Sequence, residues 1–159
     1  RENHQHSHTL MSQHPLNHRP ADEFRHRTPV QTRFNDFDMF GHANNGAYLQ
    51  YCDVAKLAYF GQFLPEGFDP AASGLVIANI NCDFIRQIVP ADKVEVLSAV
   101  TAIGESSLVL EQLVTSADGT TVHAAVRSVM VQFDACTRRP CPISSEWRSK
   151  LAGFEGRDF

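Results

Sequence analysis

Hydrophobic residues recur along this chain with two different periods. From residue 45 to residue 63 they return every three or four positions, which is the spacing of an amphipathic helix. Asn44 or Asn45 is suited to cap such a helix, because a short side-chain oxygen can accept a hydrogen bond from the first turn. The pattern predicts one long helix over Asn45–Phe63, and its apolar stripe consists of Tyr48, Tyr51, Cys52, Ala55, Ala58, Tyr59 and Phe63.

After this helix the period changes to about two, the spacing of a strand with one buried face. Ile80, Cys82 and Phe84 alternate with polar residues, and the apolar run 75–77 precedes them. The pattern predicts a strand of about ten residues whose buried face carries these three side chains.

Three more alternating segments follow, separated by short polar turns. Gly104-Glu105 and Asp118-Gly119 are suited to the hairpin turns between them. In the last segment the apolar parity shifts after Val126, which indicates a bulge or burial on both faces. The predicted strands are Lys93–Ile103, Leu108–Ser116 and Thr121–Phe133.

Two shorter elements complete the predicted fold. Thr28–Phe34 reads as a first strand, because Val30 and Phe34 share one parity. Ser145–Ala152 reads as a short helix. We expect Ser144 or Ser145 to cap the helix and Gly153 to stop it.

The order of these elements is strand, long helix, then four long strands joined mainly by hairpins. Hairpins join antiparallel strands, and one long helix is available to cover the sheet. The sequence therefore predicts an α+β domain with an antiparallel sheet.

Length and charge narrow the class of protein. A chain of 159 residues corresponds to about one domain. Fourteen Lys and Arg against eighteen Asp and Glu give a net charge of −4, which disfavours a protein that coats nucleic acid or an anionic membrane. No apolar stretch reaches the roughly 20 residues that a membrane span needs. We expect neither nucleic acid nor a membrane as a partner.

The cysteines and histidines bear on compartment and metal binding. Cys52, Cys82, Cys136 and Cys141 form no C-x-x-C pair, which favours a reduced, cytoplasmic protein. Six of the eight histidines lie within the first 26 residues, in a polar stretch without the apolar run of a signal peptide. We interpret this stretch as a solvated arm rather than as a metal site, and we expect no metal.

The chemistry concentrates just before the long helix. The segment Asp36–Asn45 reads DFDMFGHANN and places two carboxylates and an imidazole beside the helix start. Free backbone N–H groups and the helix dipole favour an anion there, so a nearby aspartate is expected to stay ionised. The same N–H groups can polarise a carbonyl. A carboxylate beside such an oxyanion site is the pairing that hydrolysis of an activated acyl group requires.

The stretch DFDMFGHANNGAYLQY resembles the D-x-D-x-x-G-H-x-N-N-x-x-Y signature of hotdog-fold acyl-CoA thioesterases of the 4-hydroxybenzoyl-CoA thioesterase-like family, and it is also similar to acyl-ACP thioesterases. The resemblance implies a hotdog fold, in which a curved five-stranded antiparallel sheet wraps a long central helix. It divides the chain into a polar His-rich arm (1–27), a hotdog domain (28–134) and a C-terminal extension with a short helix (135–159).

The resemblance also assigns roles to residues. It implies that Asp38 is the catalytic carboxylate, as general base or nucleophile, and that the backbone N–H near Asn45 polarises the thioester carbonyl. The residues that it implies line the loop and the substrate are Gly41, His42, Asn44 and Tyr48. Asp53 and Lys56 stand where the family often has a Glu and Arg pair on the helix.

Coenzyme A would enter as part of the substrate, and no separate cofactor is expected. Its phosphates need local cations in a chain of negative net charge. Arg138 and Arg139, adjacent after the last strand, and Arg86 after the second are the candidates.

The resemblance further implies a homodimer or a dimer of dimers whose sheets join edge to edge, with the active site between subunits. Two other functions remain open at this stage, a hotdog dehydratase or hydratase and a non-catalytic acyl-binding domain. The length of the acyl chain and the choice between coenzyme A and a carrier protein also stay open.

Overall fold

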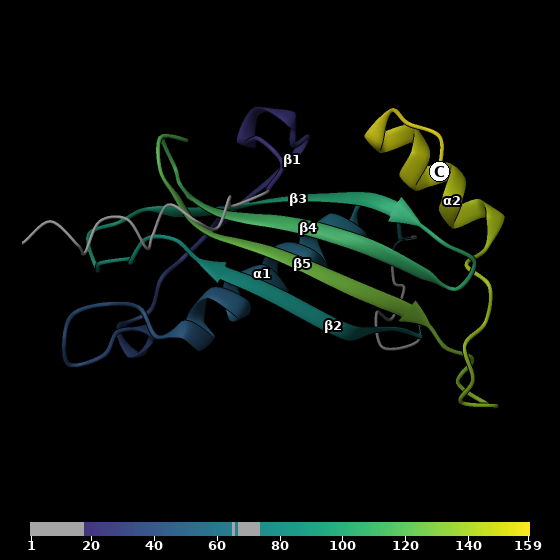
Figure 1. The fold of residues 1–159 in the computed structure, drawn as a ribbon, viewed down its shortest axis with the longest axis horizontal. Helices are drawn as coiled ribbons and strands as arrows, with labels where there is room; N and C mark the ends of the chain where they lie inside the picture. The colour runs from purple at the N-terminus through teal and green to yellow at the C-terminus, as the bar shows by residue number, and fades with distance from the viewer. Residues whose placement is uncertain (1–17, 65, 67–73) are drawn as a thin grey trace, which may run out of the picture.

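The computed structural model describes residues 18–64, 66 and 74–159, so the histidines before residue 18 lie outside the described part. The described elements follow the predicted order, with a 3-10 turn before and another after the first strand (Figure 1). They are η1 (Ala21–Glu23), β1 (His26–Val30), η2 (Phe34–Asp36), α1 (Asn45–Gly61), β2 (Leu75–Phe84), β3 (Val94–Ile103), β4 (Ser107–Ser116), β5 (Val122–Gln132) and α2 (Ser145–Glu155).

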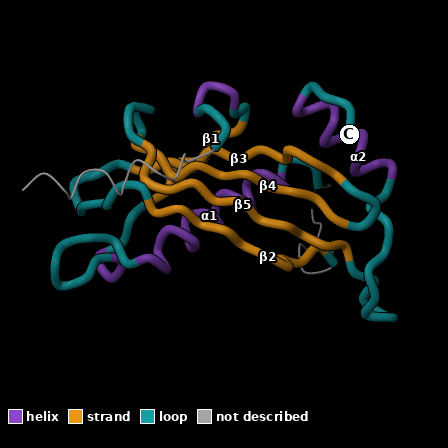
Figure 2. The backbone as a smooth tube through the Cα atoms, viewed as in Figure 1, coloured by secondary structure: helices purple, strands orange, loops and turns teal. Residues whose placement is uncertain are grey.

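The five strands form one antiparallel sheet in the order β1-β3-β4-β5-β2. Figure 2 shows the twisted sheet with α1 lying across one of its faces. The two edges differ. At one edge, β1 has five residues and contains Pro29, both of which discourage further pairing. The other edge is formed by β2, which is ten residues long.

Each face of the sheet has its own apolar cluster. On the α1 face, Tyr51 and Ala55 of the helix are buried against Val96 and Val114. On the opposite face, Phe24 from the segment before β1 is buried against Leu97, Leu113 and their neighbours. The amino-terminal segment therefore covers the face that α1 leaves open.

The second helix extends the core at the far end of α1. Leu151 is fully buried there, and Tyr59 donates a hydrogen bond to Glu155 at 2.8 Å. Phe63 and Phe154 pack edge to face, with ring centroids 5.6 Å apart. The C-terminal extension is thus part of the packed domain.

Several predicted boundaries and the predicted side-chain cap of α1 were wrong. The first strand is His26–Val30 rather than Thr28–Phe34, because the chain turns into η2 and leaves Phe34 94% exposed. The long helix ends at Gly61, two residues before Phe63. Asn44 is the N-cap, but its side chain makes no capping hydrogen bond.

The C-terminal helix runs through Gly153 and ends at Gly156, whose φ of 65° provides the left-handed cap. Its predicted start is confirmed, since the Ser144 side chain accepts a hydrogen bond from Trp147 N at 3.2 Å. In β5, four successive residues from His123 to Val126 are buried, which is the predicted burial on both faces.

The predicted burial of β2 was also wrong in this single chain. Ile80 is 40% and Phe84 48% exposed, although both lie on the parity predicted to be buried. They lie on an edge strand, and no strand of the described residues pairs with the outer side of β2.

Candidate active site

Three backbone interactions fix the loop between β1 and α1. Asn44 N donates to Asp36 O at 2.7 Å, and Ala43 N donates to Ile88 O at 2.9 Å. Phe37 and Ala43 form an isolated β-bridge. The loop is therefore fastened both to itself and to the segment that follows β2.

Asp36 joins this loop to the helix. Its carboxylate is buried and accepts hydrogen bonds from Tyr51 Oη at 2.7 Å, from Arg33 N at 2.8 Å and from Arg33 Nη2 at 2.9 Å. Burial alone would raise the pKa of Asp36, but these hydrogen bonds and the Arg33 charge outweigh burial and hold the pKa below its ordinary value. Burial raises the pKa of Tyr51, and its bond to Asp36 raises it further, so Tyr51 stays a donor.

Asp38 is exposed and only half engaged. Its Oδ1 accepts hydrogen bonds from Phe40 N at 2.8 Å and from His42 N at 3.2 Å. Its Oδ2 has no hydrogen-bond partner among the described residues. The carboxylate faces an open cleft of about 690 Å³ whose walls include Arg33, Gly41 and Pro90. One oxygen thus holds the turn while the other is available to water or substrate.

The start of α1, which follows this loop, is open. Ala47 N bonds to Asn44 O, whereas the N–H groups of Asn45 and Gly46 have no acceptor among the described residues. The first turn contains no acidic residue, and no side chain caps it. The positive end of the helix dipole is therefore free to meet an oxyanion.

The other predicted loop residues hold the turn. Gly41 has a φ of 76° and donates its N–H to Asp38 O at 3.0 Å, which explains why glycine stands there. The imidazole of His42 has no hydrogen-bond partner in the described part of the chain, and the Asn44 side chain is exposed. Both side chains are accessible to a ligand at the loop.

Tyr48 and Arg86 lie at the same end of the sheet as the loop. Tyr48 is buried, donates to Arg86 O at 3.1 Å and packs edge to face on Phe84 at 5.2 Å. Burial raises the pKa of Tyr48. Tyr48 is thus bonded in place, while the guanidinium of Arg86 is on an exposed residue near the helix start.

Arg138 and Arg139 lie at the opposite end of the sheet. The register pairs Phe84 with Ala124 and Leu75 with Gln132, so the loop after β5 leaves from the Leu75 end of β2 (Figure 1). Within one chain the structure therefore does not bring these two arginines to Asp38.

Sequence reasoning missed the role of Arg33 in the cleft wall and of Tyr51 as the partner of Asp36. The signals were a basic residue three positions before Asp36 and the tyrosines of the helical stripe, since each buried hydroxyl needs a hydrogen-bond partner. The predicted helix pair is present, with Lys56 Nζ 3.0 Å from Asp53 Oδ1.

Metal ligands and membrane-spanning helices were both sought in the described part of the chain. No group of three or more His, Cys, Asp or Glu residues there could hold a metal ion. None of the helices there is long and apolar enough to cross a membrane.

Comparison with known proteins shows the family and the fold of this chain. The family model of the thioesterase-like superfamily matches residues 32–151. The long-chain acyl-CoA thioesterase FadM of Escherichia coli is 25% identical over 128 residues, which cover 79% of this chain and 96% of FadM. The uncharacterized protein YsmA of Bacillus subtilis is 32% identical over 90 residues, which cover 57% of this chain and 60% of YsmA.

Solved structures show the same fold. A thioesterase from Thermus thermophilus, crystallised with coenzyme A and zinc, is 31% identical with a TM-score of 0.77, over 87% of this chain and 99% of that one. A predicted thioesterase from Bacillus stearothermophilus is 27% identical with a TM-score of 0.74, over 81% and 95%. The predicted hotdog fold, a long helix wrapped by a curved five-stranded antiparallel sheet, is confirmed.

Proposed function

This chain belongs to the thioesterase-like superfamily, and from that premise we propose that it hydrolyses acyl thioesters of coenzyme A. The observation that carries the proposal is an exposed carboxylate with one oxygen unengaged, Asp38, in the loop that leads into an uncapped helix start at Asn45. FadM and the Thermus protein support the substrate class, since one is named for long-chain acyl-CoA and the other holds coenzyme A.

The two groups have complementary roles in the proposed reaction. As general base, Asp38 takes a proton from water while the water oxygen adds to the thioester carbonyl carbon. The N–H of Asn45 donates to the oxyanion that forms. The intermediate then collapses, the carbon–sulfur bond breaks, and the thiolate receives the proton. In the nucleophilic route the Asp38 oxygen adds to the carbonyl carbon first, and the carbon–sulfur bond breaks to release the thiolate and leave an anhydride. Water then hydrolyses the anhydride, which releases the acid, restores the Asp38 carboxylate and supplies the proton that the thiolate takes up.

A panel of thioesters tests the function. It contains saturated acyl-CoAs of several lengths, an aromatic acyl-CoA and an enoyl-CoA, with free thiol measured throughout. A thioesterase releases thiol and acid in equal amounts. A hydratase consumes the enoyl double bond without releasing thiol, and an acyl-binding domain does neither. Either of the last two results would refute the proposal.

We propose that the active unit is a dimer joined along β2. Edge strands with exposed apolar residues favour pairing, and Val76, Ile80 and Phe84 are such residues on β2. A two-fold axis near the middle of β2 would place the Leu75 end of one strand beside the Phe84 end of the other. The far end of one chain would then lie beside the Asp38 loop of its partner.

The dimer can be tested at Ile80. A charge at this edge position should prevent strand pairing, so Ile80→Asp is expected to be monomeric by light scattering and to lose most thioesterase activity. Ala102→Asp places the same charge at an exposed position on the inner strand β3, away from the β2 edge, and should stay dimeric and active. A fully active Ile80→Asp monomer would contradict a shared site.

In this dimer Arg138 and Arg139 come from the partner, near the entrance of the Asp38 cleft. An exposed ion pair contributes roughly 0.2–1 kcal/mol, so losing both cations should raise KM about two- to thirtyfold with little change in kcat. The double variant Arg138→Asn/Arg139→Ala is suitable, because asparagine tolerates the φ of 55° at residue 138. The increase should shrink at higher salt.

The matched control for this prediction is Arg127→Ala, which removes an exposed cation from β5. It should leave KM unchanged. A KM for acyl-CoA that is the same in the double variant and the wild type, at low and moderate salt, would show that the phosphates bind elsewhere.

A further inference from the structure

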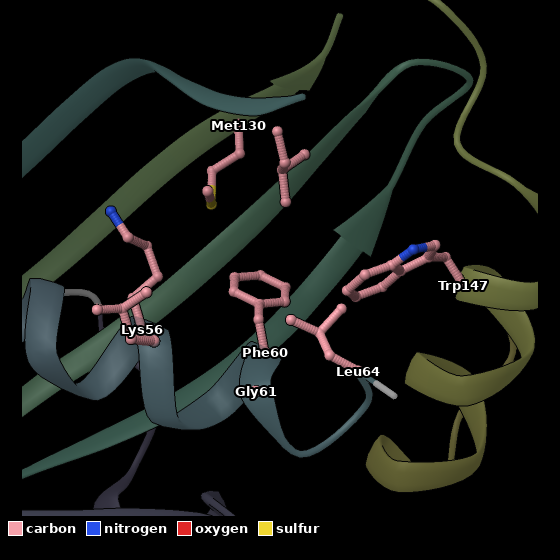
Figure 3. A pocket seen from close by; sticks show the side chains of 8 residues that line it. Lys56, Phe60, Gly61, Leu64, Met130 and Trp147 are labelled. Atoms are coloured by element: carbon pink, nitrogen blue, oxygen red, sulfur yellow. The ribbon is translucent and has the colours of Figure 1, made fainter. Parts of the chain in front are cut away.

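An apolar cavity lies at the end of α1 away from Asp38. Its volume is about 140 Å³, close to the roughly 150 Å³ of an apolar protein cavity that binds benzene. Figure 3 shows Met130 above Phe60, with Lys56 and Trp147 on opposite sides. The wall residues that matter here are Leu57, Phe60, Leu64, Leu75, Met130 and Trp147.

Among the described residues, this cavity is open to the surface and has almost no polar lining. Leu57 at its mouth is 61% exposed. The charged side chain among the described wall residues, Lys56, is paired with Asp53 at 3.0 Å. An exposed apolar hollow of this kind favours an apolar occupant over water.

The wall contributed by α2 is well braced. The Trp147 ring packs edge to face on Phe60 at 6.1 Å and on Phe63 at 6.4 Å. Ser144 fixes the first turn of α2 by accepting a hydrogen bond from Trp147 N. Trp147 therefore forms a stable end wall.

The position of the cavity along α1 and β2 determines whether it can serve the active site of its own protomer or that of the partner. Its α1 residues, 56 to 61, are 11 to 16 positions beyond Asn45, which is roughly 17–24 Å along the helix. Within one protomer, only a long acyl group could span the distance from the thioester at Asp38 to this cavity. Leu75 of the cavity wall, however, lies at the end of β2 that the proposed two-fold pairing sets beside the partner's Phe84. Phe84 packs on Tyr48 in the first turn of α1.

We propose that this cavity binds the far end of an acyl group whose thioester is held at the partner's Asp38, and that Trp147 limits the length of that group. The inference rests on the proposed thioesterase function. It assigns the substrate to acyl groups with an apolar aliphatic or aromatic end, and it excludes those that end in a charged group.

Two variants change the cavity in opposite directions. Trp147→Ala enlarges it and should raise the ratio of kcat/KM for long over short acyl-CoA by roughly tenfold. Leu57→Trp fills the mouth from an exposed position and should lower the same ratio by a similar factor. Trp147→Phe should lie between Trp147→Ala and the wild type. Thermal melting checks that each variant is folded.

Mixed dimers test which active site the cavity serves. In a mixture of Asp38→Asn and Leu57→Trp, a mixed dimer has one site that combines an intact Asp38 with an intact cavity from the other chain. If half of the dimers are mixed, long-chain activity should recover to about a quarter of the wild-type value. A cavity that serves its own chain gives no recovery, which would overturn the assignment to the partner.

The remaining outcomes separate this inference from the function on which it rests. Wild-type hydrolysis with an unchanged length profile in both cavity variants would overturn the inference alone. Loss of the dimer in Trp147→Ala with an unchanged profile would show that the cavity wall supports the dimer rather than the acyl group, which also overturns it. Absence of thiol release from every thioester by the wild type would overturn both.

Discussion

Asp38→Asn is expected to lower kcat for acyl-CoA hydrolysis at least a hundredfold, since general base catalysis contributes typically about 10² to 10⁴-fold. The fold should survive. The Oδ1 atom of Asp38 accepts hydrogen bonds from Phe40 N and His42 N, and the asparagine amide oxygen can take over both. What asparagine cannot supply is the basic or nucleophilic oxygen at Oδ2.

Initial rates of thiol release measure this effect. Asp118→Asn is the matched control, because Asp118 also lies in an exposed turn and accepts a backbone N–H two residues later, from Thr120 at 3.0 Å. The control should keep the wild-type rate. Turnover at the wild-type rate in a folded Asp38→Asn protein would show that Asp38 only shapes the turn.

Asp36→Ala should cause the second large effect, on stability. It removes the acceptor of the buried Tyr51 hydroxyl and of three Arg33 donors. Charge-assisted hydrogen bonds and the stranded donors together suggest a loss of roughly 2–4 kcal/mol in the free energy of unfolding. The β1–α1 loop should also loosen, because Asp36 fastens it to the helix, and activity should fall with it.

Denaturant unfolding as a function of pH tests the same pair. The pKa of Asp36 is lowered in the folded state, so its contribution is present above the ordinary carboxyl value of about 4 and is lost as pH falls through the lowered pKa. The difference between wild type and Asp36→Ala should therefore shrink in acid. Asp22→Ala, at an exposed aspartate, should change stability by less than about 0.5 kcal/mol. Equal stability of Asp36→Ala and wild type at neutral pH would contradict the anchoring role.

Local pattern predicted most of the fold. The helical period of the apolar residues predicted the start of α1, because the apolar stripe of this helix packs on a single face of the sheet. The alternation of apolar and polar residues predicted β3 and β4, which lie inside the sheet. The Ser144 cap is a contact between residues three apart and was equally readable. The loop around Asp38 could be singled out as a candidate site because its chemical groups are continuous in sequence.

The errors arose where a distant contact or a missing partner decides the outcome. Phe34 fits the parity of β1, but the Arg33–Asp36 contact turns the chain out of the sheet. The Asn44 backbone N–H is held by Asp36, and its side chain is left exposed. The apolar parity of β2 predicted burial that a single chain does not provide. The distance between Arg138 and Asp38 depends on strand order, which no local pattern contains.

Hydrolysis in water labelled with heavy oxygen tests the proposed reaction most directly. The wild-type protein is given an acyl-CoA over many turnovers, and the released thiol and the carboxylic acid are quantified together. We predict equal amounts of both, with one oxygen of each acid molecule drawn from the labelled water. Thiol release without labelled acid, or addition of labelled water to an enoyl group with the thioester left intact, would contradict hydrolysis at the Asp38 site.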